Sequence, residues 1–87
     1  MPEIARLGSI IIRVYADDAR RHRQPHFHAV SPDEAMVIGL PNLAVIAGRL
    51  RRSREVIEWA GQPANLGRLV NAWNRGNPGH RITHDAS

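Results

Sequence analysis

The fold is decided at Gln24-Pro25-His26-Phe27-His28, where a proline precedes two histidines that are one residue apart. Alternate side chains of an extended segment point to the same face, so His26 and His28 should share one face and Phe27 should take the other. Phe27 is the only phenylalanine in the chain and a natural core residue. The segment therefore predicts a strand with an apolar side towards the core and a histidine side opposite it.

Short apolar segments lie on both sides of this stretch, separated by residues that favour turns. The turn signals are Gly8-Ser9, Ser31-Pro32-Asp33 and Pro41-Asn42, and a polar loop is expected at residues 16–24. The strands expected between them are residues 4–7, 10–15, 26–30, 35–40 and 43–47. Consecutive strands joined mostly by short turns predict an antiparallel meander.

The apolar period changes after Gly48 and becomes helical. Residues 51–60 read as one helix, with Gly61 where its C-cap is expected, and Pro63 suits the first turn of the next. The second helix has its apolar residues at i, i+3, i+4 and i+7, namely Leu66, Leu69, Val70 and Trp73. The predicted fold class is α+β, with a sheet of about five strands and two C-terminal helices packed on one of its faces. It forms a single domain over residues 1–76, followed by a flexible polar tail at residues 77–87 that carries His80 and His84.

Composition excludes several classes of protein. The 87 residues contain no cysteine, which removes disulfides, thiolate metal sites and cysteine nucleophiles. The N-terminal residues do not read as a signal peptide, and no apolar run is long enough to cross a bilayer, so a cytoplasmic location without membrane contact is expected. No glycine-rich nucleotide loop, zinc-protease motif or nucleophile elbow is present. No cofactor is expected.

The positive charge is carried by arginine alone. The formal net charge is +4, and all 12 basic residues are arginines. A GC-rich genome would also favour arginine codons, but it explains the clustering less well. The guanidinium is a rigid fork suited to phosphate and carboxylate, so the clusters favour binding to nucleic acid or to an acidic protein partner. The candidate binding residues are Arg20, Arg21, His22, Arg23, Arg49, Arg51, Arg52 and Arg54.

The strand pattern also indicates which residues could form a site. If residues 10–15 and 26–30 are antiparallel neighbours, Phe27 and Ala29 join Ile10, Ile12 and Val14 under the helices. On the open face, His26 and His28 would then lie with Arg13 and Tyr15. A slip of one residue in the register would move every side chain to the other face.

Three interpretations of the histidine pair compete. In the first, His26 and His28 are general acid and base for RNA cleavage, Arg13 neutralises the developing phosphorane charge, and Tyr15 stacks on a base or donates a hydrogen bond. In the second, the pair binds a divalent metal together with Asp17 or Asp18. In the third, the pair is structural, with its ring nitrogens hydrogen-bonded to the backbone of a loop, or the surface binds a protein partner.

Several short motifs occur in an order that resembles a known family. They are Pro2-x-Ile4-x-Arg6, Ile12-Arg13-x-Tyr15, Asp17-Asp18, Pro25-His26-Phe27-His28, Glu58-Trp59-Ala60 and Asn71-Ala72-Trp73. Together they resemble the small bacterial family catalogued as domain of unknown function number forty-one-sixty, over residues 2–76. The resemblance implies a small protein encoded beside another short protein, in a toxin–antitoxin type pair. The chain departs from the family pattern at Ala19-Arg20-Arg21-His22-Arg23, which lengthens the loop before the histidines and makes it basic.

The leading hypothesis is a toxin-like component that binds RNA and cleaves it by metal-independent acid and base chemistry. The alternative is a non-enzymatic antitoxin or adaptor that binds the small cognate protein encoded alongside. The third and weakest reading is a divalent-metal-binding protein. A strand left at the edge of the sheet could also pair with another chain, which would give a homo- or hetero-oligomer.

Overall fold

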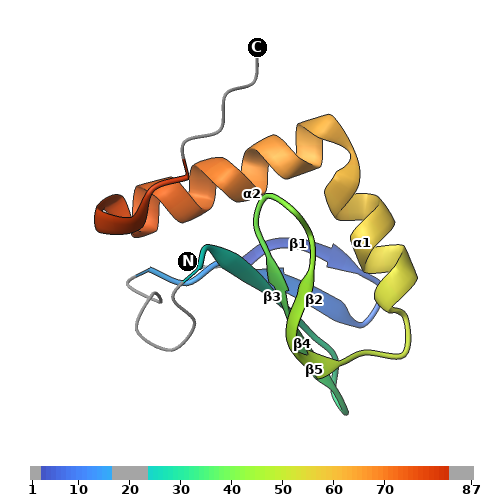
Figure 1. Ribbon diagram of the computed structural model, residues 1–87. Helices are drawn as coiled ribbons and strands as arrows, with labels where there is room; N and C mark the ends of the chain where they lie inside the picture. The colour runs from blue at the N-terminus through green and yellow to red at the C-terminus, as the bar shows by residue number, and fades with distance from the viewer. Residues whose placement is uncertain (1–2, 17–23, 83–87) are drawn as a thin grey trace.

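A computed structural model describes residues 3–16 and 24–82 of the chain, and Figure 1 shows its ribbon. The strands are β1 (Glu3–Leu7), β2 (Ile10–Arg13), β3 (His26–Val30), β4 (Ala35–Gly39) and β5 (Val45–Arg49). They are followed by the helices α1 (Ser53–Gly61) and α2 (Pro63–Gly76) and by a 3₁₀ helix, η1 (Pro78–His80). All neighbouring strands are antiparallel, and their order in the sheet is their order in the sequence. The predicted α+β meander with two following helices is confirmed.

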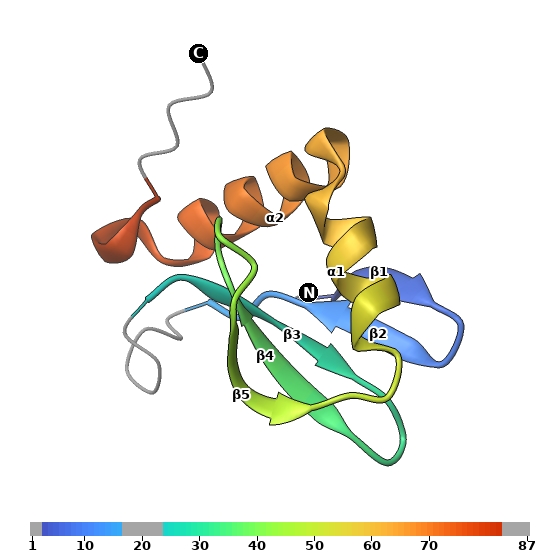
Figure 2. The same cartoon turned by 45° about the vertical axis from the view of Figure 1, so that its right-hand side comes forward.

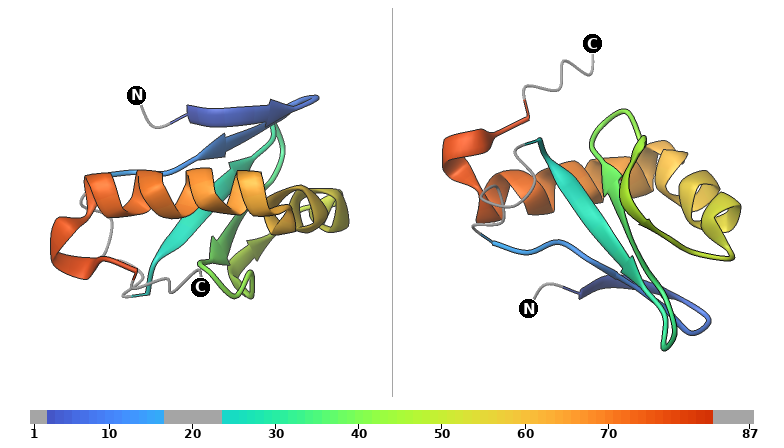
Figure 3. Two further views of the ribbon diagram at one scale, coloured as in Figure 1. Left: turned by 90° about the horizontal axis from the view of Figure 1, so that it is seen from above. Right: turned by 60° about the horizontal axis from the view of Figure 1, so that its bottom comes forward.

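Both helices lie on the same face of the sheet (Figures 1 and 2). Seen from above, α2 crosses β3 obliquely, and α1 continues the helical layer over the other end of the sheet (Figure 3, left). Pro63 is at the start of α2, where its fixed φ suits a first helical turn and its missing N–H costs no hydrogen bond. Within the described residues, neither helix has the length and apolar character needed to span a membrane.

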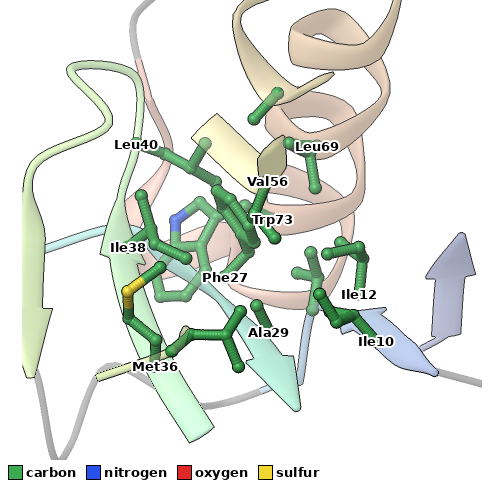
Figure 4. Packing of buried hydrophobic residues seen from close by; sticks show 13 residues of the cluster. Ile10, Ile12, Phe27, Ala29, Met36, Ile38, Leu40, Val56, Leu69 and Trp73 are labelled. Atoms are coloured by element: carbon green, nitrogen blue, oxygen red, sulfur yellow. The ribbon is translucent and has the colours of Figure 1, made fainter. Parts of the chain in front are cut away.

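The core lies between the helices and the face of β3 that carries Phe27. Cross-strand pairing places Ile12 opposite Ala29, so β2 and β3 are antiparallel neighbours and the condition on which the sequence interpretation depended is met. Phe27 and Trp73 are both fully buried, and Figure 4 shows them among side chains from the sheet and from the helices. The other buried apolar residues are Ile10, Ile12, Val14, Ala29, Met36, Ile38, Leu40, Leu50, Val56, Ala60, Leu69 and Val70.

Several boundaries differ from the sequence prediction by one or two residues. Strand β2 ends at Arg13, so Tyr15 follows the strand instead of belonging to it. The expected two-residue turn at Pro41-Asn42 is a longer loop, because Leu43 adopts a left-handed conformation with φ of 61° and its N–H bonds to the carbonyl of Gly39. Consequently β5 begins at Val45, two residues later than expected.

Hydrogen bonds connect the residues that follow α2 to the helix. The indole N–H of Trp73 donates to the carbonyl of His80 at 2.8 Å, and the side chain of Asn74 exchanges two hydrogen bonds with the backbone of Ile82. The expected flexible tail begins at residue 77, but these hydrogen bonds join residues 77–82 to α2. Residues 83–87, which include His84, lie outside the described residues.

An ion pair lies at the start of α1. The guanidinium of Arg52 donates two hydrogen bonds to the carboxylate of Glu55, at 3.0 and 2.6 Å. Hydrogen bonding by Arg52 holds the pKa of Glu55 below its usual value. A carboxyl with a lowered folded-state pKa stabilises the fold above its unfolded-state pKa, and that contribution is lost as the pH falls through the folded-state pKa.

Alanine substitutions at Gly48 and Gly67 compare a crowded backbone position with an open one. Gly48 has φ of 74°, and a Cβ there would collide with the backbone carbonyl of Ala35 on β4, whereas a Cβ at Gly67 in α2 would meet no atom within 4 Å. Gly48→Ala should therefore lower the free energy of unfolding by about 1–3 kcal/mol or more. Gly67→Ala should raise it by about 0.5–1 kcal/mol, because alanine loses less backbone entropy in a helix. Urea denaturation measures both, and equal effects of the two substitutions would contradict the β4–β5 geometry.

The Arg52–Glu55 pair predicts a specific titration. In Arg52→Gln the pKa of the Glu55 carboxyl should rise towards its ordinary value, because the charged hydrogen bonds that favour the carboxylate are lost. An NMR pH titration of the glutamate side chains measures it. Arg54→Gln serves as the control, because Arg54 lies beside Glu55 in α1 but forms no hydrogen bond with it in the structure. A Glu55 pKa that is the same in both variants would contradict the pairing.

Candidate functional site

Pairing of β2 with β3 brings together the four residues that the sequence singled out. Arg13 lies directly opposite His28 in the register. Tyr15 follows β2 and meets the ring of His28 edge to face, with the ring centroids 4.8 Å apart and the planes at 81°. The rings of His28 and His26 are also edge to face, at 5.1 Å. Arg13, Tyr15, His28 and His26 therefore form a continuous cluster, here called the β2–β3 cluster.

Arg13 and Tyr15 are joined by a polar contact. Nη1 of Arg13 donates to the hydroxyl oxygen of Tyr15 at 3.4 Å, which is long for a hydrogen bond. Since a guanidinium cannot accept, the tyrosine oxygen accepts, and its own proton points elsewhere. Arg13 is half-buried, and its Nε is buried without a hydrogen-bond acceptor among the described residues. A buried donor without an acceptor is costly.

His26 does not lie on the open face, and this part of the prediction is wrong. Its exposed fraction is 0%, and its ring packs against the indole of Trp73 with the centroids 5.0 Å apart. His26 is the first residue of β3, and at this end of the strand its ring meets Trp73 from α2. Alternation along a strand predicts the direction of a side chain but not what lies over the end of the sheet.

A hydrogen bond orients the buried ring of His26. Its Nδ1 lies 2.9 Å from the backbone carbonyl of Gln24. A carbonyl only accepts, so Nδ1 carries a hydrogen, and in the neutral ring the lone pair is on Nε2. His26 is thus held in one orientation by Gln24 on one side and by Trp73 on the other. His28, which is half-buried, is the histidine of the pair that reaches the surface.

Asn77 is a site residue that sequence reasoning missed. It is 3% exposed, and its Nδ2 donates to the carbonyl of Tyr15 at 3.0 Å and to that of Trp73 at 3.1 Å. It therefore joins the segment after β2 to the C-terminal end of α2 and fixes the backbone from which Tyr15 projects. An asparagine directly after Gly76 is a typical signal for the end of a helix, but it gives no indication of the long-range bond to Tyr15.

The arginines of the second basic cluster lie apart from the β2–β3 cluster. Arg49 is on β5, at the edge of the sheet and separated from β3 by β4. Arg51, Arg52 and Arg54 lie at the start of α1, whereas His26 and Tyr15 lie at the opposite end of the helical layer, near the end of α2 (Figure 1). All four arginines are exposed, but Arg52 is paired with Glu55, and the backbone N–H of Arg51 is bonded to Glu34.

The other predicted residues lie outside the described part of the chain. These are the basic loop residues Arg20, Arg21, His22 and Arg23 and the carboxylates Asp17 and Asp18. Within residues 3–16 and 24–82, no three histidine or acidic side chains come close enough to hold a metal ion. The metal interpretation depends on Asp17 or Asp18 and stays a prediction.

Comparison with known proteins identifies the family. Residues 9–74 match the family described as Domain of unknown function (DUF4160), which covers the sheet from the end of the first hairpin turn and nearly all of α2. No curated protein and no solved structure matches the chain. The matched segment contains the whole β2–β3 cluster and extends over most of the chain. The protein therefore belongs to the DUF4160 family.

Proposed function

We propose that the protein is the toxin-like component of a bacterial toxin–antitoxin type pair, and that it acts in the cytoplasm by binding and cleaving RNA. The observation that carries the proposal is the contact of His28 with Tyr15, which in turn accepts a hydrogen bond from the half-buried Arg13. An imidazole, a phenol and a guanidinium within one cluster are the groups that phosphodiester chemistry needs.

The arrangement suggests a role for each group in cleavage. His28 would take the proton of the ribose 2′-hydroxyl as this oxygen attacks the adjacent phosphorus. The bond from phosphorus to the 5′-oxygen then breaks, and that oxygen takes the phenolic proton of Tyr15, whose oxygen already accepts from Arg13. Arg13, a permanently charged guanidinium beside Tyr15, would offset the negative charge that develops on the phosphorane. The products are a 2′,3′-cyclic phosphate and a 5′-hydroxyl.

In this scheme His26 acts through His28. Because it is fully buried, it does not reach a substrate phosphate, and its ring instead supports the ring of His28 at 5.1 Å. Its hydrogen bond to Gln24 and its contact with Trp73 fix the position of that support. His26 is thus a positioning residue, and His28, Tyr15 and Arg13 are the candidate catalytic residues.

Cleavage assays with substituted proteins test the proposal. Purified protein is incubated with single-stranded RNA in the presence of a metal chelator, and the product ends are identified by mass spectrometry. His28→Ala and Tyr15→Phe should each lower the rate by about 10²–10⁴-fold, the contribution of one general acid or base. His80→Ala is the control, since His80 is exposed and the hydrogen bonds that the structure gives it use its backbone N–H and carbonyl. RNA with 2′-deoxyribose at the cleaved position should resist cleavage.

Three outcomes would contradict the catalytic scheme. The first is wild-type protein that leaves RNA intact, and the second is a His28→Ala variant as active as His80→Ala. The third is cleavage of the 2′-deoxy substrate, because that substrate lacks the attacking hydroxyl.

A second candidate function is a non-enzymatic antitoxin or adaptor. The observation that favours it is the open edge of β5, where Val45 is 50% exposed and is the only large exposed apolar residue in the described ranges. Arg49 on the same strand and Arg51 and Arg54 nearby are exposed and would favour an acidic partner.

Co-expression with the neighbouring short gene separates the two functions. A toxin-like ribonuclease should slow growth when expressed alone, and the neighbouring protein should relieve that effect. An antitoxin or adaptor should be harmless alone, should co-purify with its partner and should lose the partner in Val45→Lys, which places a charge on the edge strand. The control is Val30→Lys, since Val30 is half-buried on β3 and lies away from this edge.

A further inference from the structure

A groove runs between α2 and the edge strand β1, and it begins at the β2–β3 cluster. A pocket of about 410 Å³ is lined by Tyr15 and its neighbours on one side and by the last turns of α2 on the other. A second pocket of about 270 Å³ continues along α2 to Arg68. The two pockets share Ile4, Ala72 and Arg75, so they form one groove. Figure 3 (left) shows the edge strand β1 running along one side of α2.

Two arginines of α2 line this groove on one face of the helix. Arg68 and Arg75 are seven residues apart, which corresponds to about two turns and ~10.5 Å along the helix axis. Both are exposed. Asn71 lies between them and lines the groove with an exposed amide. The spacing suits successive contacts to an extended polyanion better than to a single small ion.

The side chains that line the groove give it a net positive charge. Arg68 donates to the backbone carbonyl of Ile4 at 2.7 Å, which fixes its guanidinium at the wall while its remaining N–H groups stay available. Arg75 has no ion pair within the described part of the chain. The carboxylate that lines the groove, Glu3, is bonded to Arg6 at 2.7 Å and is largely neutralised by it.

From this arrangement we infer that the groove binds a single strand of RNA that continues from the cleaved nucleotide, with Arg75 and then Arg68 on successive parts of its phosphate backbone. The inference rests on the proposed function, because the groove opens beside Tyr15. Arginine forks recognise phosphate oxygens, and the Asn71 amide can donate to or accept from a base edge. Ile4 and Ala72 provide an apolar floor on which a sugar or base can lie.

Oligonucleotides of two lengths test the inference. A dinucleotide occupies only the β2–β3 cluster, whereas a strand of about eight nucleotides is long enough to follow the groove. Binding of 2′-O-methyl RNA, which cannot be cleaved by the proposed route, is measured by fluorescence anisotropy, with the dinucleotide as competitor. The proteins are wild type, Arg68→Gln, Arg75→Gln and Arg81→Gln. Arg81 is exposed but lines neither pocket, so it controls for the loss of one positive charge.

Arg68→Gln and Arg75→Gln should each weaken binding of the longer strand by roughly 3–10-fold and lower the slope of log affinity against log salt by about 0.7, the value for one phosphate contact to a single strand. Arg68→Gln should leave dinucleotide affinity unchanged, and Arg81→Gln should match wild type for both ligands. Melting temperatures show whether each variant is folded. Arg75→Gln removes no hydrogen bond that the structure shows, so it is expected to fold. If Arg68→Gln proved unstable, Arg75→Gln would still test the groove.

The results distinguish a failure of the groove assignment from a failure of the proposed function. If wild type binds the longer strand and both groove variants bind it equally well, the groove assignment is overturned and the proposed function stands. If wild type binds neither ligand, the proposed function fails and the groove assignment fails with it. If the groove variants keep their RNA affinity but lose the cognate protein, the groove is a protein-docking surface, which also overturns the inference.

Discussion

Trp73 connects the sheet to the helical layer that packs on it. It is fully buried between the helices and the sheet, its ring meets the ring of His26, and its N–H donates to the carbonyl of His80. Its backbone carbonyl accepts from Asn77, which also binds the backbone of Tyr15. The core, the end of α2 and the start of β3 therefore meet at Trp73, and Asn77 connects the segment after β2 to the same residue. Burying so large an aromatic surface is worth enough to fix this junction.

This constraint explains why the two histidines of the motif differ. A strand places both on the same side, but at the first residue of β3 the ring meets the indole of Trp73, whereas the ring of the third residue meets Tyr15. His26 is consequently packed and oriented, and His28 is half-buried beside Tyr15 and Arg13. In the proposed chemistry, a rigid buried partner behind a surface histidine keeps the reacting ring in one orientation, which lowers the entropic cost of reaching the transition state.

Much of the fold followed from local patterns in the sequence. The alternation around Phe27 and the apolar spacing from Leu66 to Trp73 predicted the buried side of β3 and the second helix, because each pattern reports burial along a single element. The register of β2 and β3 comes from the structure. The burial of His26 and the roles of Asn77, Arg68 and Arg75 could not be predicted in this way. They depend on which elements meet in space, and the bond from Asn77 to Tyr15 joins residues that are 62 positions apart. The left-handed conformation of Leu43, which delays β5, also has no signal in the residue type.

The central claim is that His28, Tyr15 and Arg13 form a phosphate-handling site. The most direct measurement is an NMR titration of wild-type protein with a nucleoside 3′-monophosphate, following the ring resonances of the histidines and of Tyr15. The proposal predicts saturable shifts at His28 and Tyr15, with His80 unchanged, and loss of those shifts in Arg13→Gln. Resonances of His28 and Tyr15 that do not move at saturating nucleotide, or that move equally in Arg13→Gln, would contradict it.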